Sequence, residues 1–306
     1  MVKKIKKKLL VTGGTGFIGY HLILAAKKKQ WDVTSISLQK PKLHRYIKGV
    51  KYIKADITDI EELRKKLKKS FHYIVNLAGY GKHNSFSEGG DKIFKTHFLG
   101  LVNLTKIFSK KKIKKLVQIG SSEEYGLALA PQKENIECKP NSPYALGKLA
   151  STDFLKILYE KEKYPSTTIR LFLVYGPGQE NNRILPQVIN GCIKNKKFSI
   201  SKGSQTRDFC YIDDVVEAIL LALSSKRVNG EIINIGSGEP QLVKNVVEKI
   251  RKILKKGKPQ YGKIKFRKGE NIKLYPIIKK AKQKLKWRPK TKFNTGLKIT
   301  INSFKK

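Results

Sequence analysis

The chain has 306 residues, of which 40% are hydrophobic and 29% charged, a composition that supports a sizeable buried core and excludes disorder and a small disulfide-stapled domain. Cys138, Cys192 and Cys210 are scattered and form no CxxC pair, so we expect neither a disulfide framework nor a bound metal. Because no apolar run approaches the roughly 18 residues of a membrane span, we predict a cytoplasmic protein without a membrane partner.

The charge is strongly positive, with 66 Lys and Arg against 23 Asp and Glu and a formal net charge of +43. Nucleic-acid-binding proteins carry such a charge, but here the lysines form KK and KKK runs without interleaved aromatic residues for base stacking. We interpret the charge as the lysine-rich surface of an enzyme that has no specific nucleic-acid partner. Binding to polyanions should be weak and sensitive to salt.

Short β-branched runs alternate with longer amphipathic stretches, which is typical of a parallel sheet covered by helices on both faces. The first half is predicted to contain strands at 8–12, 33–38, 50–54, 73–77, 116–119 and 167–172. Its predicted helices are 17–29, 59–68, 89–109 and 143–163. Beyond Gly176 we expect helices at 184–195, 213–224 and 243–254, and a strand at 231–235. The pattern predicts an α/β fold with a doubly wound parallel sheet and a smaller C-terminal α/β lobe.

A glycine cluster follows the first predicted strand, with Gly13, Gly16 and Gly19 in GxxGxxG spacing. This spacing turns a strand tightly into a helix and brings backbone N–H groups and the helix N-terminus to a pyrophosphate. We therefore predict a Rossmann-type dinucleotide site, formed here by Gly13, Thr15, Gly16, Phe17, Ile18 and Gly19.

The end of the second strand indicates which dinucleotide binds. NAD enzymes usually carry a carboxylate there for the adenosine ribose, whereas this chain has Ser37, followed by Lys40. The missing acid favours NADP, with Ser37 and one of the nearby basic residues Lys40, Lys42 or Arg45 beside the 2′-phosphate. NAD stays possible.

Tyr144 and Lys148 form a YxxxK pair at the start of a predicted helix, so both side chains lie on one helical face. A lysine ammonium beside a phenol lowers the pKa of the phenol toward the range useful for proton transfer. Ser121 lies just past the predicted strand 116–119, where its hydroxyl can bind the reacting oxygen of a substrate. We predict that Ser121, Tyr144 and Lys148 are the catalytic residues.

The chain resembles the extended short-chain dehydrogenase/reductases, in particular the branch of NDP-sugar epimerases, dehydratases and reductases. The resemblance runs nearly end to end and is carried by TGGTGFIG from Thr12, NLAG from Asn76, SSEEYG from Ser121, SPYALGK from Ser142, RLFLVYGPG from Arg170, RDFCYIDD from Arg207, NIGSG from Asn234 and LKWRPKTKF near the C-terminus. It implies an NAD(P)-binding domain at 1–176, which holds the catalytic residues, and an integrated NDP-sugar-binding lobe at 177–306. Relatives of this kind commonly form homodimers.

The resemblance also implies further site residues. Cofactor contacts are expected from Asp56, Ile57, Leu77, Ala78 and Gly79, besides Tyr144 and Lys148. Asp56 is alternatively only the N-cap of the next helix. Substrate contacts are expected from Lys82, Ser122, Glu123, Asn182, Arg207 and Arg267. The two arginines suit a diphosphate or nucleoside, although they are alternatively ordinary surface residues.

Three departures from the family pattern bear on the reaction. Ser122 stands where the 4,6-dehydratases have an aspartate that takes part in water removal, so dehydration is not expected. Glu123 stands where the 3,5-epimerase/4-reductases have a cysteine. His97 replaces a common asparagine and is either a packing residue or a ligand.

The SSEEYG and SPYALGK motifs are most similar to NDP-4-keto-6-deoxysugar reductases. We therefore expect NADPH-dependent reduction of a C4 ketone, in which Tyr144 protonates the developing alkoxide, Lys148 lowers the pKa of the phenol and holds the nicotinamide ribose, and Ser121 orients the carbonyl. An NDP-sugar 4-epimerase with retained NAD is the alternative, since it needs the same residues. A third reading is a non-catalytic dinucleotide-sensing or nucleic-acid-associated protein.

Overall fold

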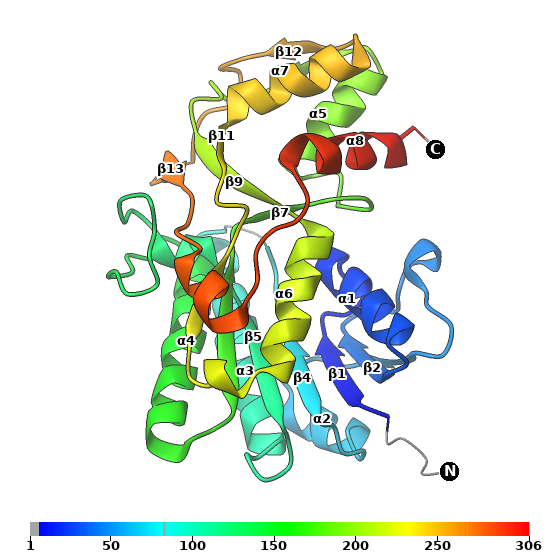
Figure 1. The fold of residues 1–306 in the computed structure, drawn as a ribbon, viewed down its shortest axis with the longest axis vertical. Helices are drawn as coiled ribbons and strands as arrows, with labels where there is room; N and C mark the ends of the chain where they lie inside the picture. The colour runs from blue at the N-terminus through cyan, green and yellow to red at the C-terminus, as the bar shows by residue number, and fades with distance from the viewer. Residues whose placement is uncertain (1–5, 82–83, 268, 306) are drawn as a thin grey trace. The chain divides into compact units, whose positions relative to one another are not determined.

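The computed structural model describes residues 6–81, 84–267 and 269–305 (Figure 1). The chain divides into two compact units, each built from separate segments. Unit 1 comprises Met1–Glu124, Pro140–Arg170 and Val216–Ile233, and unit 2 comprises Tyr125–Lys139, Leu171–Val215 and Asn234–Lys306. The sequence predicted a different kind of division, between a cofactor-binding part at 1–176 and a substrate-binding part at 177–306. That functional division stays a prediction.

The main sheet has seven strands in the order β10-β6-β5-β4-β1-β2-β3. Their bounds are β1 Lys8–Thr12, β2 Asp32–Ser37, β3 Lys51–Lys54, β4 Tyr73–Asn76, β5 Lys115–Ser121, β6 Ser166–Leu171 and β10 Ile232–Ile235. The neighbouring pairs from β3 through β2, β1 and β4 to β5 are parallel. The order reverses beside β1, as in a Rossmann-type doubly wound sheet, which confirms the predicted fold class.

The helices of unit 1 begin and end close to the predicted residues. They are α1 Phe17–Lys28, α2 Ile60–Lys66, α3 Gly90–Ile107 and α4 Pro143–Glu162, together with most of α6, Ile212–Ser224. The start of α4 has a clear local cause, because Ser142 accepts the N–H of Ala145 and Pro143 takes the first helical position. This start places the YxxxK pair in the first two turns of α4.

Alternating strand residues build a continuous core in unit 1. Leu10, Ile36, Ile74 and Leu116, one from each of four neighbouring strands, are fully buried in a single cluster. The same cluster includes Leu63 of α2, Leu101 and Leu104 of α3, and Leu155 of α4. The core fixes the carboxyl ends of β1, β2, β4 and β5, which come to one edge of the sheet because the strands are parallel.

Unit 2 is a smaller α/β assembly. Its strands are β7 Leu173–Tyr175, β8 Lys197–Ser199, β9 Thr206–Tyr211, β11 Pro240–Leu242, β12 Lys258–Gln260 and β13 Lys273–Leu274, and its helices are α5 Ile184–Ile193, α7 Val243–Leu254 and α8 Phe293–Ser303. Strand β9 is central, pairing antiparallel with β11 and parallel with β7 and β13. These strands were not predicted from the sequence, and most of them have only two or three residues.

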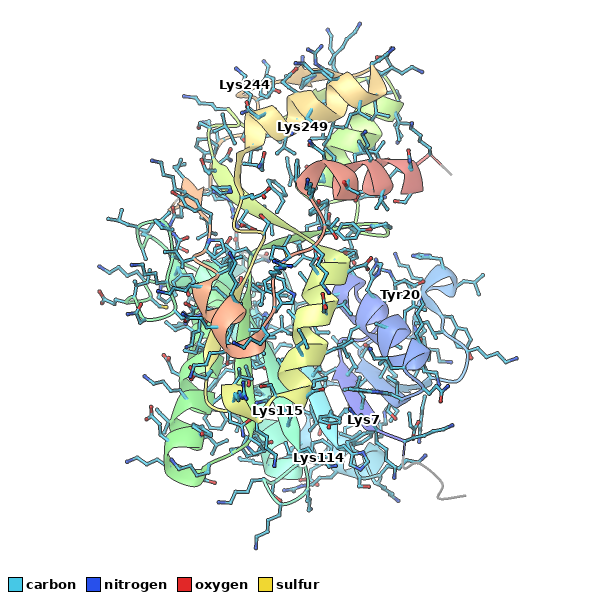
Figure 2. All side chains as sticks on the ribbon, in the orientation of Figure 1. Lys7, Tyr20, Lys114, Lys115, Lys244 and Lys249 are labelled. Atoms are coloured by element: carbon cyan, nitrogen blue, oxygen red, sulfur yellow. The ribbon has the colours of Figure 1, made fainter. Side chains whose placement is uncertain are left out.

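Many lysine side chains lie at the surface of both units, as Figure 2 shows for the chain as a whole. Lys114 of unit 1 and Lys244 of unit 2 are exposed examples. In the described ranges, none of the helices combines the length and apolar character needed to cross a membrane.

Candidate active site

The glycine loop between β1 and α1 is pressed against the chain that follows β4. Gly13 has φ +70°, and a Cβ atom on it would lie 2.8 Å from the backbone carbonyl carbon of Leu77. Its N–H donates to the carbonyl oxygen of Ile36 at 2.7 Å. Only glycine satisfies both the backbone conformation and the close approach.

The first turn of α1 fits a phosphate. Gly16 is the N-cap and provides no side-chain cap, and the turn holds no acidic residue. Backbone N–H groups at such a helix start need an acceptor, and a pyrophosphate supplies one together with favourable charge for the helix dipole. Thr15, Phe17, Ile18 and Gly19 lie in this loop and turn as predicted.

At the end of β2, the structure brings an arginine to the loop. The hydroxyl of Ser37 accepts the N–H of Thr15 at 3.3 Å, and Nη1 of Arg45 donates to the carbonyl oxygen of Thr15 at 3.1 Å. Lys40, in contrast, is exposed in the segment after β2. Ser37 and Arg45 are therefore both held against Thr15 of the glycine loop at the end of β2.

Asp56 follows β3 but does not cap the next helix. The N-cap of α2 is Asp59, whose side chain accepts the N–H of Glu62 at 2.9 Å, so the capping alternative for Asp56 is wrong. Asp56 Oδ1 accepts both the N–H and the hydroxyl of Thr58, at 2.9 and 2.8 Å. Ile57, the next residue, is buried.

The three predicted catalytic residues lie in unit 1, where β5 ends and α4 begins. Nζ of Lys148 donates to the carbonyl oxygen of Ile119 at 2.6 Å and lies 6.0 Å from the centre of the Tyr144 ring. Ser121, two residues beyond Ile119, accepts the N–H of Glu123 on its Oγ at 3.2 Å, and its own proton remains for donation. Ser121 and Lys148 are buried, whereas Tyr144 is half-buried.

Burial and a neighbouring carboxylate oppose each other at Lys148. Burial lowers the pKa of its amine to about 8, while the negative charge of Glu124 acts to raise it. The amine is therefore mostly protonated at neutral pH. A protonated lysine beside Tyr144 favours the phenolate form of the tyrosine and makes the phenol a better acid.

His97 of α3 packs against Tyr144, and among the described residues its Nδ1 has no hydrogen-bond partner. Its side chain is buried, its Nε2 lies 3.1 Å from the carbonyl oxygen of Tyr80, and its ring stands edge-on to Tyr144 with centroids 5.1 Å apart. Burial, aided by the charge of Lys148, lowers the pKa of the imidazole to about 3, so the ring is neutral. Gly79 makes room for it, because a Cβ atom there would lie 1.9 Å from Cε1 of His97.

The predicted substrate residues fall into two groups. Ser122 is buried and Glu123 half-buried, directly after Ser121 in unit 1. Lys82 lies outside the described residues. Asn182, Arg207 and Arg267 belong to unit 2.

In unit 2, the carboxylate of Glu270 lies within ion-pair distance of both Arg207 and Arg267. Glu270 Oε1 lies 2.8 Å from Nη2 of Arg207, and its Oε2 lies 3.8 Å from Nε of Arg267. Arg207 is buried, so it is not a surface arginine, whereas the side chain of Arg267 is half-exposed. Asn182 is exposed in the segment before α5. Glu270 was not predicted from the sequence, although a carboxylate three residues after Arg267 indicates a partner for that arginine.

Comparison with known proteins identifies the family. Residues 9–236 match the NAD dependent epimerase/dehydratase family. The chain belongs to this family. It is thus an enzyme of the extended short-chain dehydrogenase/reductases, whose relatives include nucleotide-sugar epimerases, dehydratases and decarboxylases.

Individual relatives carry different activities. A putative UDP-glucose 4-epimerase of Methanocaldococcus jannaschii is 30% identical, covering 97% of this chain and 98% of the relative. The UDP-glucose 4-epimerase of Thermotoga maritima, solved with UDP-glucose, has a TM-score of 0.90 and 27% identity, covering 97% and 98%. The dTDP-glucose 4,6-dehydratase of Bacillus anthracis, solved with NAD, has a TM-score of 0.87 and 25% identity, covering 98% and 96%.

Proposed function

We propose that this enzyme reduces the C4 ketone of an NDP-4-keto-6-deoxysugar with NADPH. The observation that carries the proposal is the end of β2, where Ser37 and the guanidinium of Arg45 flank Thr15 and no carboxylate follows the strand. A cation with a small hydroxyl suits a 2′-phosphate, which a carboxylate would repel. A preference for NADPH favours net reduction, because a cofactor that is regenerated within each turnover has no need of the phosphorylated form.

The residues of unit 1 fit a bound dinucleotide, since three of the four residues in the loop between β1 and α1 are glycines and the first turn of α1 has no side-chain cap. NADPH, when bound, supplies the hydride that reduces the ketone carbon. Tyr144 donates its phenolic proton to the ketone oxygen as negative charge develops there. The ammonium of Lys148 stabilises the phenolate that remains, and the hydroxyl of Ser121 donates a hydrogen bond to the same ketone oxygen.

The segment after β5 supports reduction over dehydration. Removing water from a sugar needs an acid and a base beside the reacting carbons, and Ser122 provides no carboxylate at the position where the dehydratases have one. In unit 2, Arg207 and Arg267 are proposed to bind the diphosphate or nucleoside, with Glu270 fixing their orientation.

The test is a panel of NDP-4-keto-6-deoxysugars incubated with NADPH or NADH while the absorbance of the reduced cofactor is followed. We expect consumption of NADPH in proportion to the ketosugar. Binding of NADPH without turnover of any sugar nucleotide would instead support the non-catalytic alternative.

A 4-epimerase with retained NAD is the second candidate, favoured by the 30% identity to a putative UDP-glucose 4-epimerase. It would use the same Tyr144, Lys148 and Ser121, with the proton and hydride returned to the sugar within one turnover. Conversion of an NDP-hexose without net change in cofactor absorbance would establish this activity and overturn the first proposal.

We also propose a homodimer, supported by exposed apolar side chains on two helices that pack together. Leu99 of α3 is 39% exposed, and Leu146 and Ile157 of α4 are 40% and 57% exposed. Sedimentation equilibrium of the wild type and of Ile157→Lys tests this, since only the wild type is expected to dimerise.

A further inference from the structure

Glu124 is a fully buried carboxylate that the proposed mechanism does not use. It lies in the short 3-10 turn Ser122–Tyr125 (η3) directly after β5. Its Oε1 accepts the backbone N–H of Ser121 at 2.7 Å. Its Oε2 accepts the hydroxyl of Thr152 at 2.8 Å and Nε of Arg170 at 2.7 Å.

These contacts tie together three elements of unit 1. Ser121 ends β5, Thr152 lies one turn beyond Lys148 on α4, and Arg170 belongs to β6. The carboxylate sits directly against the β5 backbone, because a Cβ atom on Gly120 would lie 2.4 Å from Glu124 Oε1. One side chain therefore sets the position of Ser121 relative to the helix that carries Lys148.

The carboxylate of Glu124 also supplies negative charge near the amine of Lys148. The titratable groups around Lys148 and Glu124 are Tyr144 and Asp153 on α4, His97 on α3 and Arg170 on β6. His97 is neutral, and Arg170 is cationic and paired with Glu124. Glu124 thus provides negative charge that opposes the loss of the Lys148 proton in a buried setting.

We propose that Glu124 is a positioning residue of the active site, which holds Ser121 against α4 and places its negative charge close to Lys148. Its carboxylate accepts the hydroxyl of Thr152, which also lies 3.2 Å from the carbonyl oxygen of Lys148. Its effect on turnover rests on the proposed function, whereas its effect on Lys148 does not. The two parts therefore need separate measurements.

The first measurement needs no substrate. Lysine isotopically labelled at Cε is titrated by NMR in the full-length protein, and the Lys148 signal is assigned by its loss in Lys148→Met. In Glu124→Gln we expect the midpoint of Lys148 to fall by about one pH unit, the scale expected when a close opposite charge is lost. Lys115 is an internal reference, since its pKa is lowered by burial and not by a charged partner.

Glu160→Gln is the matched control, because it removes one carboxylate from an exposed position on α4. In this variant, the titration midpoints of Lys148 and Lys115 should both stay at their wild-type values. An unchanged Lys148 midpoint in Glu124→Gln, or an equal shift of both lysines, would overturn the proposal.

Since Glu124→Gln leaves Arg170 buried without its carboxylate, the variant is at risk of not folding. The double variant Glu124→Gln with Arg170→Gln removes both charges. It is expected to show a smaller fall of the Lys148 midpoint than the single variant, because loss of the Arg170 cation partly offsets loss of the carboxylate. Failure of both variants to fold would make Glu124 a structural residue and end the proposal.

The second measurement is the pH profile of NADPH-dependent reduction. In Glu124→Gln the alkaline limb should move to lower pH with the Lys148 midpoint, and kcat should fall about tenfold with KM nearly unchanged, since Ser121 and Lys148 act on the reacting oxygen. If the Lys148 midpoint shifts but the wild type reduces no ketosugar, the positioning role stands and the proposed function fails. If the wild type is active and Glu124→Gln has the same pH profile, the positioning role fails.

Discussion

Lys148 donates a hydrogen bond of 2.6 Å from Nζ to the carbonyl oxygen of Ile119, and so joins helix α4 to strand β5 two residues before Ser121. The lysine of the YxxxK pair and the serine that follows the strand are thereby held in one geometry. Tyr144, four residues earlier on the same helix, shares this support. The hydrogen bond from Lys148 to Ile119 therefore fixes the positions of Ser121, Tyr144 and Lys148 relative to one another.

Replacing Tyr144 with phenylalanine should lower turnover by about 100-fold or more, because the phenolic proton donor is lost while the ring stays. Binding of NADPH should change by only a few fold. Steady-state rates and fluorescence titration of the cofactor measure the two effects. A variant with more than about a tenth of the wild-type rate would show that Tyr144 is not the proton donor.

Replacing Ser37 with aspartate should weaken NADPH relative to NADH, because a carboxylate would stand beside the 2′-phosphate. Arg45→Gln should act in the same direction without adding a negative charge, whereas Lys40→Gln should have a smaller effect because Lys40 is exposed after the strand. The measurement is the ratio of the dissociation constants for NADPH and NADH, compared between the wild type and each variant. A wild type that already prefers NADH would show that our reading of β2 is wrong.

Replacing Gly79 with alanine should lower the free energy of unfolding by about 2 kcal/mol or more, because the new Cβ would lie 1.9 Å from Cε1 of His97. Gly89→Ala is the control, since Gly89 also has a positive φ but nothing within 4 Å of a Cβ atom, and should cost about 1 kcal/mol. Denaturant unfolding measures both. Adding His97→Ala to Gly79→Ala should restore part of the loss; equal effects of the two glycine variants would exclude the clash.

Lys115, labelled in Figure 2, should make stability depend on pH. It is buried at the start of β5, its Nζ donates to the carbonyl oxygen of Ser225 and to Asn229, and burial lowers the pKa of the amine from 10.5 to about 7. The unfolded chain therefore binds more protons between these two pH values, and the contribution of this group to stability rises with pH across that window.

Lys115→Met removes this dependence. The free energy of unfolding of the variant minus that of the wild type should be largest below about pH 7 and should decline toward about pH 10. Denaturant unfolding over this range gives the difference directly. A difference that is constant with pH would mean that Lys115 has an ordinary pKa in the folded protein.

The lysine-rich surface should give weak polyanion binding that is lost at higher salt. Released counterions would supply nearly all of its free energy, so raising salt from about 50 to 200 mM should abolish oligonucleotide binding of any sequence. NADPH should remain bound, because oriented backbone N–H groups at the start of α1 are screened less than the open surface. Sequence-selective binding at the higher salt would indicate a dedicated nucleic-acid site.

Local patterns predicted unit 1 well because its elements are long and strongly periodic. Strand β1 has the predicted bounds, and α4 begins at Pro143 as expected, since proline and its preceding serine are direct start signals. Strand β9 of unit 2 was not predicted because it is stabilised by pairing with β7, β11 and β13, which are distant from it in sequence. Strands as short as β13, Lys273–Leu274, leave no period to detect.

Site residues that lie at a fixed spacing in the sequence, such as Tyr144 and Lys148, could be predicted. Residues whose role depends on a contact with a distant part of the chain could not. Glu124 meets Arg170 across 46 residues of chain, and no local pattern announces that contact. Arg45 likewise reaches Thr15 across 30 residues, whereas the sequence alone offered Lys40, Lys42 and Arg45 without a way to choose among them. The role of His97 depended on the room that Gly79 leaves for its ring.

Because unit 1 takes its last segment from Val216–Ile233, its sheet stays incomplete until late in synthesis. Strand β10, Ile232–Ile235, covers the outer edge of β6, whose residues are buried in the finished protein. A nascent chain that stalls, or a transcript that ends, between these strands leaves the backbone N–H and C=O groups along one edge of β6 open to pairing with neighbouring chains. Premature termination in that stretch is therefore expected to yield aggregates and not a smaller active enzyme.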